Sequence, residues 1–239
     1  MFYRKFATFT ATLVLTLSAS IAGLAVETNN KTSKVYEPVN LAILIQDDVT
    51  SQVSNEIADT RDFIRSLPNG SQVMVGYITA GSLQVKQEFT TDLNQAAASL
   101  RVPRASTAAS PYNPYVGVIE ALRKFDTNAS ARNAVLLISD GLDTSHGFDA
   151  SSAGNTVDLH RAIKRANDQN VAVYAFYAPT VGLTSRSYLA ASYGQSSLNR
   201  LANDTGGKAF FQGSTGFVSF DSHFRGLVRT LNERSARIS

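Results

Sequence analysis

Cysteine is absent from the 239 residues, and histidine occurs only at His146, His160 and His223. Without cysteine the chain has no thiol nucleophile, no disulfide framework and no thiolate zinc site. The Gly-x-Ser-x-Gly run that carries the nucleophile of many serine hydrolases is also missing. His146 stands in a polar loop and His160 on a helix surface, so we expect solvated or boundary histidines. These absences leave no signal for a thiol or serine enzyme.

Charged residues are sparse as well, at 17% of the sequence, while apolar residues reach 44%. That balance is typical of a globular protein rather than a disordered one. The formal net charge of +3 falls to +1 if a leader containing Arg4 and Lys5 is removed. No Lys/Arg cluster with interleaved aromatics is present, so we predict no nucleic-acid partner.

The first 25 residues have the pattern of a secretory signal peptide. Arg4 and Lys5 precede an uncharged stretch at residues 6–24, and small residues surround Ala25. A retained membrane anchor is the alternative, because the stretch is nearly long enough to span a bilayer. Since threonine and serine dilute the run, we expect cleavage near Ala25. The mature protein would then be extracytoplasmic, either periplasmic or secreted, without a membrane span.

After a polar linker at residues 26–37, strand-like and helix-like apolar periods alternate along the chain. Strands are predicted at residues 39–45, 73–78, 83–89, 134–138, 171–177 and 208–212. Helices are predicted at residues 52–67, 92–100, 114–125, 156–168, 185–203 and 217–231. Strands that alternate with helices imply a mainly parallel sheet covered on both faces. We therefore predict one α/β domain over residues 38–239, with a doubly wound six-stranded sheet and one antiparallel edge strand.

Two of the predicted strands run directly into acidic loops. Residues 46–50 read Gln-Asp-Asp-Val-Thr after the first strand, and residues 139–141 read Ser-Asp-Gly after the strand at 134–138. In open α/β sheets ligands bind outside the carboxyl ends of the strands. Both loops are expected at that edge, where their side-chain oxygens are of the kind that Mg²⁺ and Ca²⁺ prefer.

This order of elements, together with the two loops, resembles the von Willebrand factor type A domain and is most similar to its secreted bacterial branch. The resemblance covers about residues 38–234, and its most specific piece is Ile-Ser-Asp-Gly at residues 138–141. It implies a protein-interaction module of the adhesion type, without catalytic residues. In that family a divalent cation at the sheet edge binds an acidic group of the partner.

The resemblance also implies where the cation would be held. The family's first loop reads Asp-x-Ser-x-Ser, so Gln46 replaces the first carboxylate, and Asp48 and Thr50 take the two serine positions. Asn113 falls on the threonine of the second loop, and Asp140 alone is unchanged. The resemblance therefore implies a degenerate metal-ion-dependent adhesion site. We expect at most weak Mg²⁺ or Ca²⁺ binding, because neutral amides replace better ligands.

Other interpretations of the first loop are open at this point. A shift by one residue would put Asp47 in the first ligand position, but Val49 would then stand where a hydroxyl is needed. The acidic residues could instead cap the following helix, where the helix dipole favours negative charge. Asp140 would then only close a turn.

The same loop resembles the Asp-x-Asp-x-Thr motif of haloacid-dehalogenase-like phosphatases, with Asp140 and Asp143 as a later acidic pair. The first aspartate of that motif is the nucleophile. Here Gln46 stands in its place, and a neutral amide cannot form the phosphoenzyme. The interaction module is therefore the preferred function, and the phosphatase is the alternative.

Three residues are candidate contacts for a protein partner, namely Tyr112, Asp143 and Tyr188. Loops over a rigid sheet often carry function, and tyrosine is an effective contact residue. The alternative for the tyrosines is that they only cover Tyr115, which is itself a predicted core residue.

Overall fold

The computed structural model describes residues 37–50, 52–106, 113–126, 132–145, 147, 156–211 and 219–235. The chain divides into two units, Met1–Ser33 and Lys34–Ser239, and all described helices and strands belong to the second. The expected signal peptide, most of the linker and Tyr112 lie outside the described residues. Within the described ranges no helix has the length and apolarity needed to cross a membrane.

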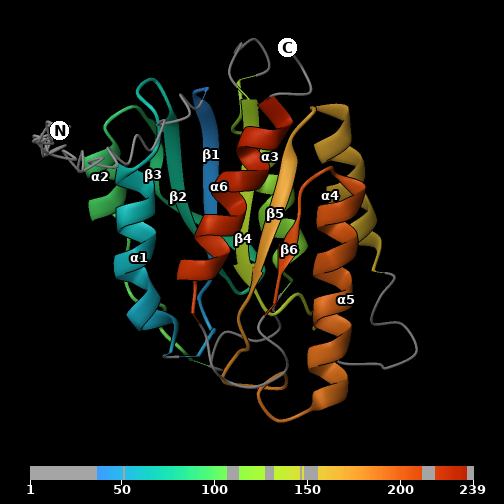
Figure 1. The fold of residues 1–239 in the computed structure, drawn as a ribbon. Coiled ribbons are helices and arrows are strands. Elements are labelled where there is room, and N and C mark those ends of the chain that lie inside the picture. Colours follow the sequence, from blue (N-terminus) through green and yellow to red (C-terminus); the bar gives the residue numbers. More distant parts are fainter. Residues whose placement is uncertain are drawn as a thin grey trace, which may run out of the picture. The chain divides into compact units, whose positions relative to one another are not determined.

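Six strands form one sheet in the order β3-β2-β1-β4-β5-β6 (Figure 1). Their bounds are β1 Val39–Gln46, β2 Gln72–Thr79, β3 Ser82–Thr90, β4 Arg132–Ser139, β5 Ala172–Tyr177 and β6 Ala209–Phe210. Every neighbouring pair is parallel except β2 and β3, which form the antiparallel edge. The predicted doubly wound sheet with one antiparallel edge strand is confirmed.

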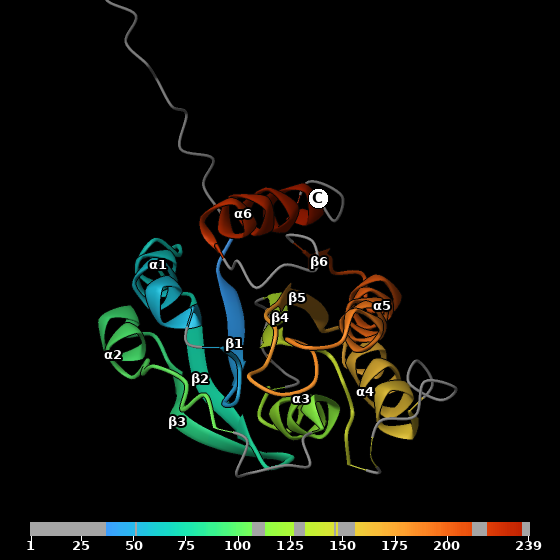
Figure 2. The ribbon, with the colours of Figure 1, turned by 90° about the horizontal axis from the view of Figure 1, so that it is seen from below.

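Helices cover both faces of the sheet (Figure 2). One face carries α1 (Val53–Arg65), α2 (Leu93–Ala98) and α6 (Asp221–Ser235), and the other carries α3 (Pro114–Leu122), α4 (Val157–Asp168) and α5 (Tyr188–Asp204). Successive side chains of each strand face opposite layers, as β1 shows. Ile43 and Ile45 pack under the first group of helices, whereas Ala42 and Leu44 pack under the second. This two-sided burial explains why the strands read as continuous apolar runs.

The helix ends follow local chemistry. Asn113 caps α3, which begins at Pro114, the predicted first residue of this helix, and Asp92 caps α2 by accepting a hydrogen bond from the Gln95 amide. Helix α5 begins at Tyr188 rather than at residue 185, because Ser187 is its N-cap and bonds the Ala190 amide. The three preceding residues therefore belong to the loop.

The sheet reverses its strand order between β1 and β4. From β1 the chain continues to β2 and β3 on one side, and it returns to add β4, β5 and β6 on the other. Ligands of open α/β sheets bind at such a switch point, outside the carboxyl ends of the strands. Gln46 ends β1 and Ser139 ends β4, so the fold brings the two acidic loops to this point.

Gly194 lets α5 lie directly against the loop after β4. A Cβ atom at Gly194 would be 1.9 Å from the Asp140 carbonyl oxygen, far inside contact distance. We expect Gly194→Ala to lower the free energy of unfolding by about 1–3 kcal/mol, because the helix or the loop must move. Urea denaturation measures the change.

The control is Ser192→Ala, on the exposed side of the same helix, with an expected change within about 0.5 kcal/mol. Equal stability of the two variants would show that α5 is not held against the Asp140 loop.

Candidate functional site

Gln46 links the two acidic loops at the switch point. Its side chain is buried, and Nε2 donates to Asp48 Oδ1 at 2.8 Å. Its Oε1 accepts from the Ser139 hydroxyl and, at 3.4 Å, from the Asp140 backbone N–H. A carboxylate at this position would only accept, and it would repel an ionised Asp48. The amide therefore connects the loops in a way that aspartate could not.

Asp48 and Asp140 are both buried, and neither has a basic partner within ion-pair distance in the described part of the chain. Asp140 Oδ1 accepts from the Leu142 amide at 3.1 Å, and Oδ2 accepts from the Thr184 hydroxyl at 3.1 Å. Burial, followed by the charge of Asp140, raises the pKa of Asp48 to about 7. Burial also raises the pKa of Asp140. The pair therefore resists double ionisation.

Thr50 adds a hydroxyl two residues beyond Asp48. Its backbone N–H donates to the Pro179 carbonyl at 2.9 Å, while its Oγ1 is buried and has no hydrogen-bond partner among the described residues. The described residues include no cluster of three or more His, Cys, Asp or Glu side chains placed to hold a metal. A cation at this edge would therefore rely on two carboxylates and on hydroxyl oxygen.

Asp47 serves a different purpose. Both of its oxygens accept from the Arg101 guanidinium, at 2.7 and 2.9 Å, and Oδ1 also accepts from the Arg104 amide at 3.0 Å. Burial pushes the pKa of Asp47 up, but the hydrogen bonds from Arg101 and Arg104 outweigh it and hold the pKa below its usual range. Because its oxygens are engaged there, the geometry favours the register with Gln46 in the first ligand position.

The helix-cap interpretation of the first loop is wrong. Helix α1 begins at Val53, its N-cap residue is Gln52, and no side chain makes the cap hydrogen bond. The side chains of Asp48 and Thr50 therefore do not cap α1, although the Thr50 carbonyl accepts from the Val53 N–H at 3.1 Å. Asp140, in contrast, does close a turn through its bond to the Leu142 amide.

Asn113 is engaged at the start of α3. Its Oδ1 accepts from the Tyr115 amide at 3.1 Å and from the Val116 amide at 3.4 Å. Its Nδ2 donates to Asp143 and Asp158, each at 3.0 Å. No hydrogen bond among the described residues joins it to the group formed by Gln46, Asp48 and Asp140. The ligand role that the resemblance implied for Asn113 is therefore not supported by this geometry.

Asp143 is half-buried and holds its own loop together. Besides Asn113, it accepts from the Ser145 amide at 3.0 Å and from the Ser145 hydroxyl. Its oxygens are thus engaged within the protein, and partner contact by Asp143 stays a prediction. Tyr115, in contrast, is confirmed as a core residue, and its hydroxyl donates to the Gly141 carbonyl at 2.5 Å.

Large apolar side chains are exposed around this edge. Tyr188 is 76% exposed, and the other exposed large apolar residues of the described chain are Val102, Val157, Leu183 and Leu189. Leu183 and Leu189 lie in the segment after β5, Val157 begins α4, and Val102 follows the arginine that holds Asp47. All five thus belong to the loops and helix starts at the carboxyl edge. Among these five residues Tyr188 was a predicted contact residue, and apolar residues within polar loops are a sequence signal for the others.

The histidines offer no catalytic arrangement in the described residues. His160 is exposed on α4, as expected of a surface residue. His223 is buried against aromatic rings of the opposite layer, and burial lowers its pKa to about 4. His146 lies outside the described residues.

The two adjacent aspartates predict opposite effects of the same substitution. For Asp48 the folded pKa, about 7, lies above the reference value of 3.8. The protonated Asp48 carboxyl group contributes fully to the free energy of unfolding at low pH, and this contribution is lost as the pH rises through 7. Asp48→Asn stays neutral, so we expect it to raise the free energy of unfolding by about 1–3 kcal/mol at pH 8 in metal-free buffer. At pH 5 the gain should be smaller.

The matched variant is Asp47→Asn, which breaks the paired hydrogen bonds with Arg101. We expect it to lower the free energy of unfolding at pH 8 by about 2–4 kcal/mol, because a partly buried ion pair loses its buried partner. Urea denaturation of both variants at the two pH values makes the comparison. A loss of stability in both at pH 8 would contradict the assignment of Asp48 as an uncompensated acid.

No protein-family model and no curated protein matches the sequence, but solved structures match the fold. An aerotolerance-related membrane protein from Bacteroides fragilis is similar over 82% of this chain and 99% of its own, with a TM-score of 0.56 and 13% identity. The conserved hypothetical protein BatB from Bacteroides thetaiotaomicron is similar over 83% and 99%, with a TM-score of 0.55 and 14% identity.

Proximal thread matrix protein 1 from the mussel byssus, solved with a zinc-occupied MIDAS motif, is similar over 82% of this chain and 48% of its own. Its TM-score is 0.51 and the identity is 15%. Identities this low show the fold alone. The strand order, the antiparallel edge and the loops that meet at the switch point agree with these likenesses, and the protein has the fold of the von Willebrand factor type A domain.

Proposed function

We propose that this protein is an extracytoplasmic, non-catalytic protein-interaction module whose partner binds at the carboxyl edge of the sheet. The supporting observation is that every exposed large apolar side chain of the described residues belongs to this edge. Scattered apolar residues on a surface are ordinary, whereas their concentration on one surface marks interaction sites. The signal-peptide pattern supports the extracytoplasmic location.

The apolar residues are anchored to the acidic loops. The segment after β5 carries Leu183 and leads to Tyr188, and its backbone bonds the first loop, with Val181 N–H donating to the Asp48 carbonyl at 3.0 Å. Thr184 in the same segment donates to Asp140. A change at the acidic pair would therefore move the surface that displays the apolar side chains.

We propose further that a divalent cation assists binding weakly. Asp48 and Asp140 would supply carboxylates and Thr50 the hydroxyl whose oxygen has no partner among the described residues. The cation would relieve the repulsion between the carboxylates and offer an open position to an acidic group of the partner. The affinity would be low, because Gln46 already donates to Asp48. The zinc in the MIDAS motif of the mussel protein is a precedent within this fold.

The partner surface can be tested by capture from the native envelope or secretome. The bait is compared with a Tyr188→Ser/Leu189→Ser variant, which removes two exposed apolar contacts. We expect recovery of the bound partner to fall about tenfold or more, since a tyrosine that acts as an interface hot spot is worth about 2 kcal/mol or more.

The matched control is Gln84→Ser/Lys86→Ser, two exposed positions on the edge strand β3. It should retain the partner at the wild-type level. Equal recovery with all three baits would refute the carboxyl edge as the contact surface.

The cation can be tested separately by thermal melting at pH 8, above the pKa of about 7 of Asp48. Millimolar Mg²⁺, Ca²⁺, Mn²⁺ or Zn²⁺ should raise the wild-type melting temperature by about 2–4 °C through mass action on the folded state. Asp140→Ala should abolish the response. Gln46→Asp should enlarge it, because a third carboxylate replaces the amide.

Glu88→Gln, an exposed acid on β3, is the control and should respond like the wild type. If none of the four ions moves the wild-type curve, cation assistance is wrong. The capture experiment without a chelator still decides whether the edge binds a partner.

A further inference from the structure

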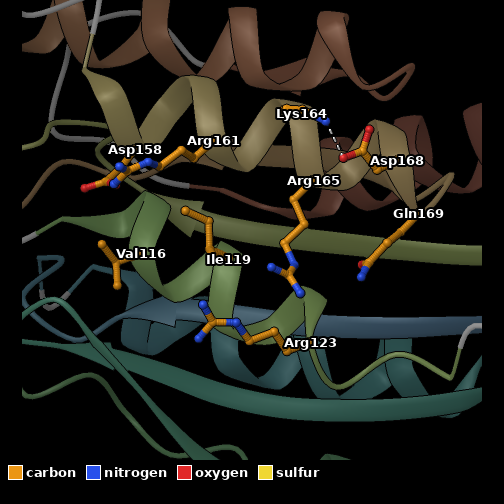
Figure 3. A pocket seen from close by; sticks show the side chains of 9 residues that line it. All are labelled: Val116, Ile119, Arg123, Asp158, Arg161, Lys164, Arg165, Asp168 and Gln169. Carbon is orange, nitrogen blue, oxygen red and sulfur yellow. Dashed lines mark hydrogen bonds and ion pairs between the residues drawn. The ribbon is translucent and has the colours of Figure 1, made fainter.

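A groove of about 670 Å³ runs between α3 and α4, on the helical layer that also contains α5 (Figure 3). It is built from different residues than the carboxyl edge, and none of the sequence motifs pointed to it. Val116 and Ile119 of α3 form an apolar wall, and charged side chains of both helices surround it. The groove therefore combines an apolar wall with a charged lining.

The lining carries an uncompensated positive charge. Four basic and two acidic residues contribute to it, and both acids are already paired. The ion pairs are Arg161–Asp158 at 3.2 Å and Lys164–Asp168 at 2.7 Å. Arg123 and Arg165 have no acidic partner within ion-pair distance in the part of the chain that the structure describes. Figure 3 shows Arg165 extending from α4 towards α3, where Arg123 lies.

Two buried polar atoms of the groove also lack a partner among the described residues, namely Arg165 Nε and Gln169 Oε1. They lie one helical turn apart, so their side chains share one face of α4. One atom is a donor and the other an acceptor. Buried polar groups are hydrogen-bonded in nearly all native structures. Both atoms are covered in this conformation, so a ligand reaches them only when the two side chains turn outward; it would then supply an acceptor and a donor about one helical turn apart, together with negative charge.

We propose that this groove binds an extended acidic segment of a partner protein. A peptide backbone supplies a carbonyl oxygen for Arg165 Nε and an N–H for Gln169 Oε1. Acidic side chains of the segment pair with the guanidinium groups of Arg123 and Arg165, which favour carboxylates in bidentate geometry. Small apolar side chains of the segment pack against Val116 and Ile119. A phosphodiester or lipid phosphate offers only acceptors and leaves Gln169 Oε1 without a donor.

The test measures fluorescence anisotropy of a labelled, capped octapeptide of alternating glutamate and alanine with the full chain at low salt. A peptide with glutamine in place of glutamate is the probe control. We expect it to bind about tenfold more weakly, because the charge pairing is lost. Arg123→Gln/Arg165→Gln should weaken binding of the glutamate peptide by about tenfold or more, and Gln169→Leu by about threefold.

Arg161→Gln is the matched control, since this arginine lines the same groove but already has an acidic partner. It should change the affinity by less than about twofold. If the double variant is unfolded by its melting curve, Arg123→Glu replaces it, because Arg123 is exposed. That single charge reversal should also weaken binding about tenfold.

The proposal is overturned if the glutamate and glutamine peptides bind equally, or if removing Arg123 and Arg165 leaves the affinity unchanged. It is also overturned if a ten-nucleotide oligothymidylate or a phosphatidylglycerol vesicle binds more tightly than the glutamate peptide through the same arginines. Absence of measurable binding by the glutamate peptide has the same consequence. The edge variant Tyr188→Ser/Leu189→Ser should bind the glutamate peptide normally, which separates this groove from the carboxyl edge.

Discussion

The neutral amide of Gln46 holds together a sheet edge that contains two buried acids. Burying a carboxyl group is costly unless donors satisfy it, and no basic side chain pairs with Asp48 or Asp140 in the described chain. The amide donates to Asp48 and accepts from the loop of Asp140, while Thr184 donates to Asp140. Because Thr184 belongs to the segment between Leu183 and Tyr188, this network also holds the segment that carries these two exposed residues.

The contrast between Asp47 and Asp48 shows that neighbours, more than burial, decide the role of an acid. Both side chains are buried, yet the pKa of Asp47 is lowered and that of Asp48 is raised. Asp47 faces Arg101, whose guanidinium bonds both of its oxygens and lies over the ring of Tyr77. Asp48 accepts from the Gln46 amide, and the charge of Asp140 acts on it. The first aspartate thus fixes a loop, and the second is a buried acid without a basic partner, whose ionisation is shifted to higher pH.

The order of helices and strands could be predicted because apolar periodicity survives in each element, and Asn113-Pro114 marks a helix start that local geometry dictates. The meeting of Gln46 and Asp140 also followed, since parallel strands bring their carboxyl ends together. The hydrogen bonds from Asn113 to Asp143 and Asp158 did not follow, because no sequence period specifies which oxygens an amide will engage. The ion pair of Asp47 with Arg101 joins residues that are 54 positions apart, and it could not be predicted for the same reason.

The two proposed surfaces differ in the force that would act on a partner. At the carboxyl edge, apolar side chains surround acids that are already buried, so contact there would depend on removing apolar surface from water. In the groove between α3 and α4, Arg123 and Arg165 leave positive charge without compensation, so attraction there would be electrostatic and weakened by salt. Because the expected net charge of the mature protein is near zero, net charge alone does not reveal the positively charged groove. A partner with an apolar tip and an acidic tail would engage both surfaces, and an effective concentration set by its linker would then strengthen two weak contacts.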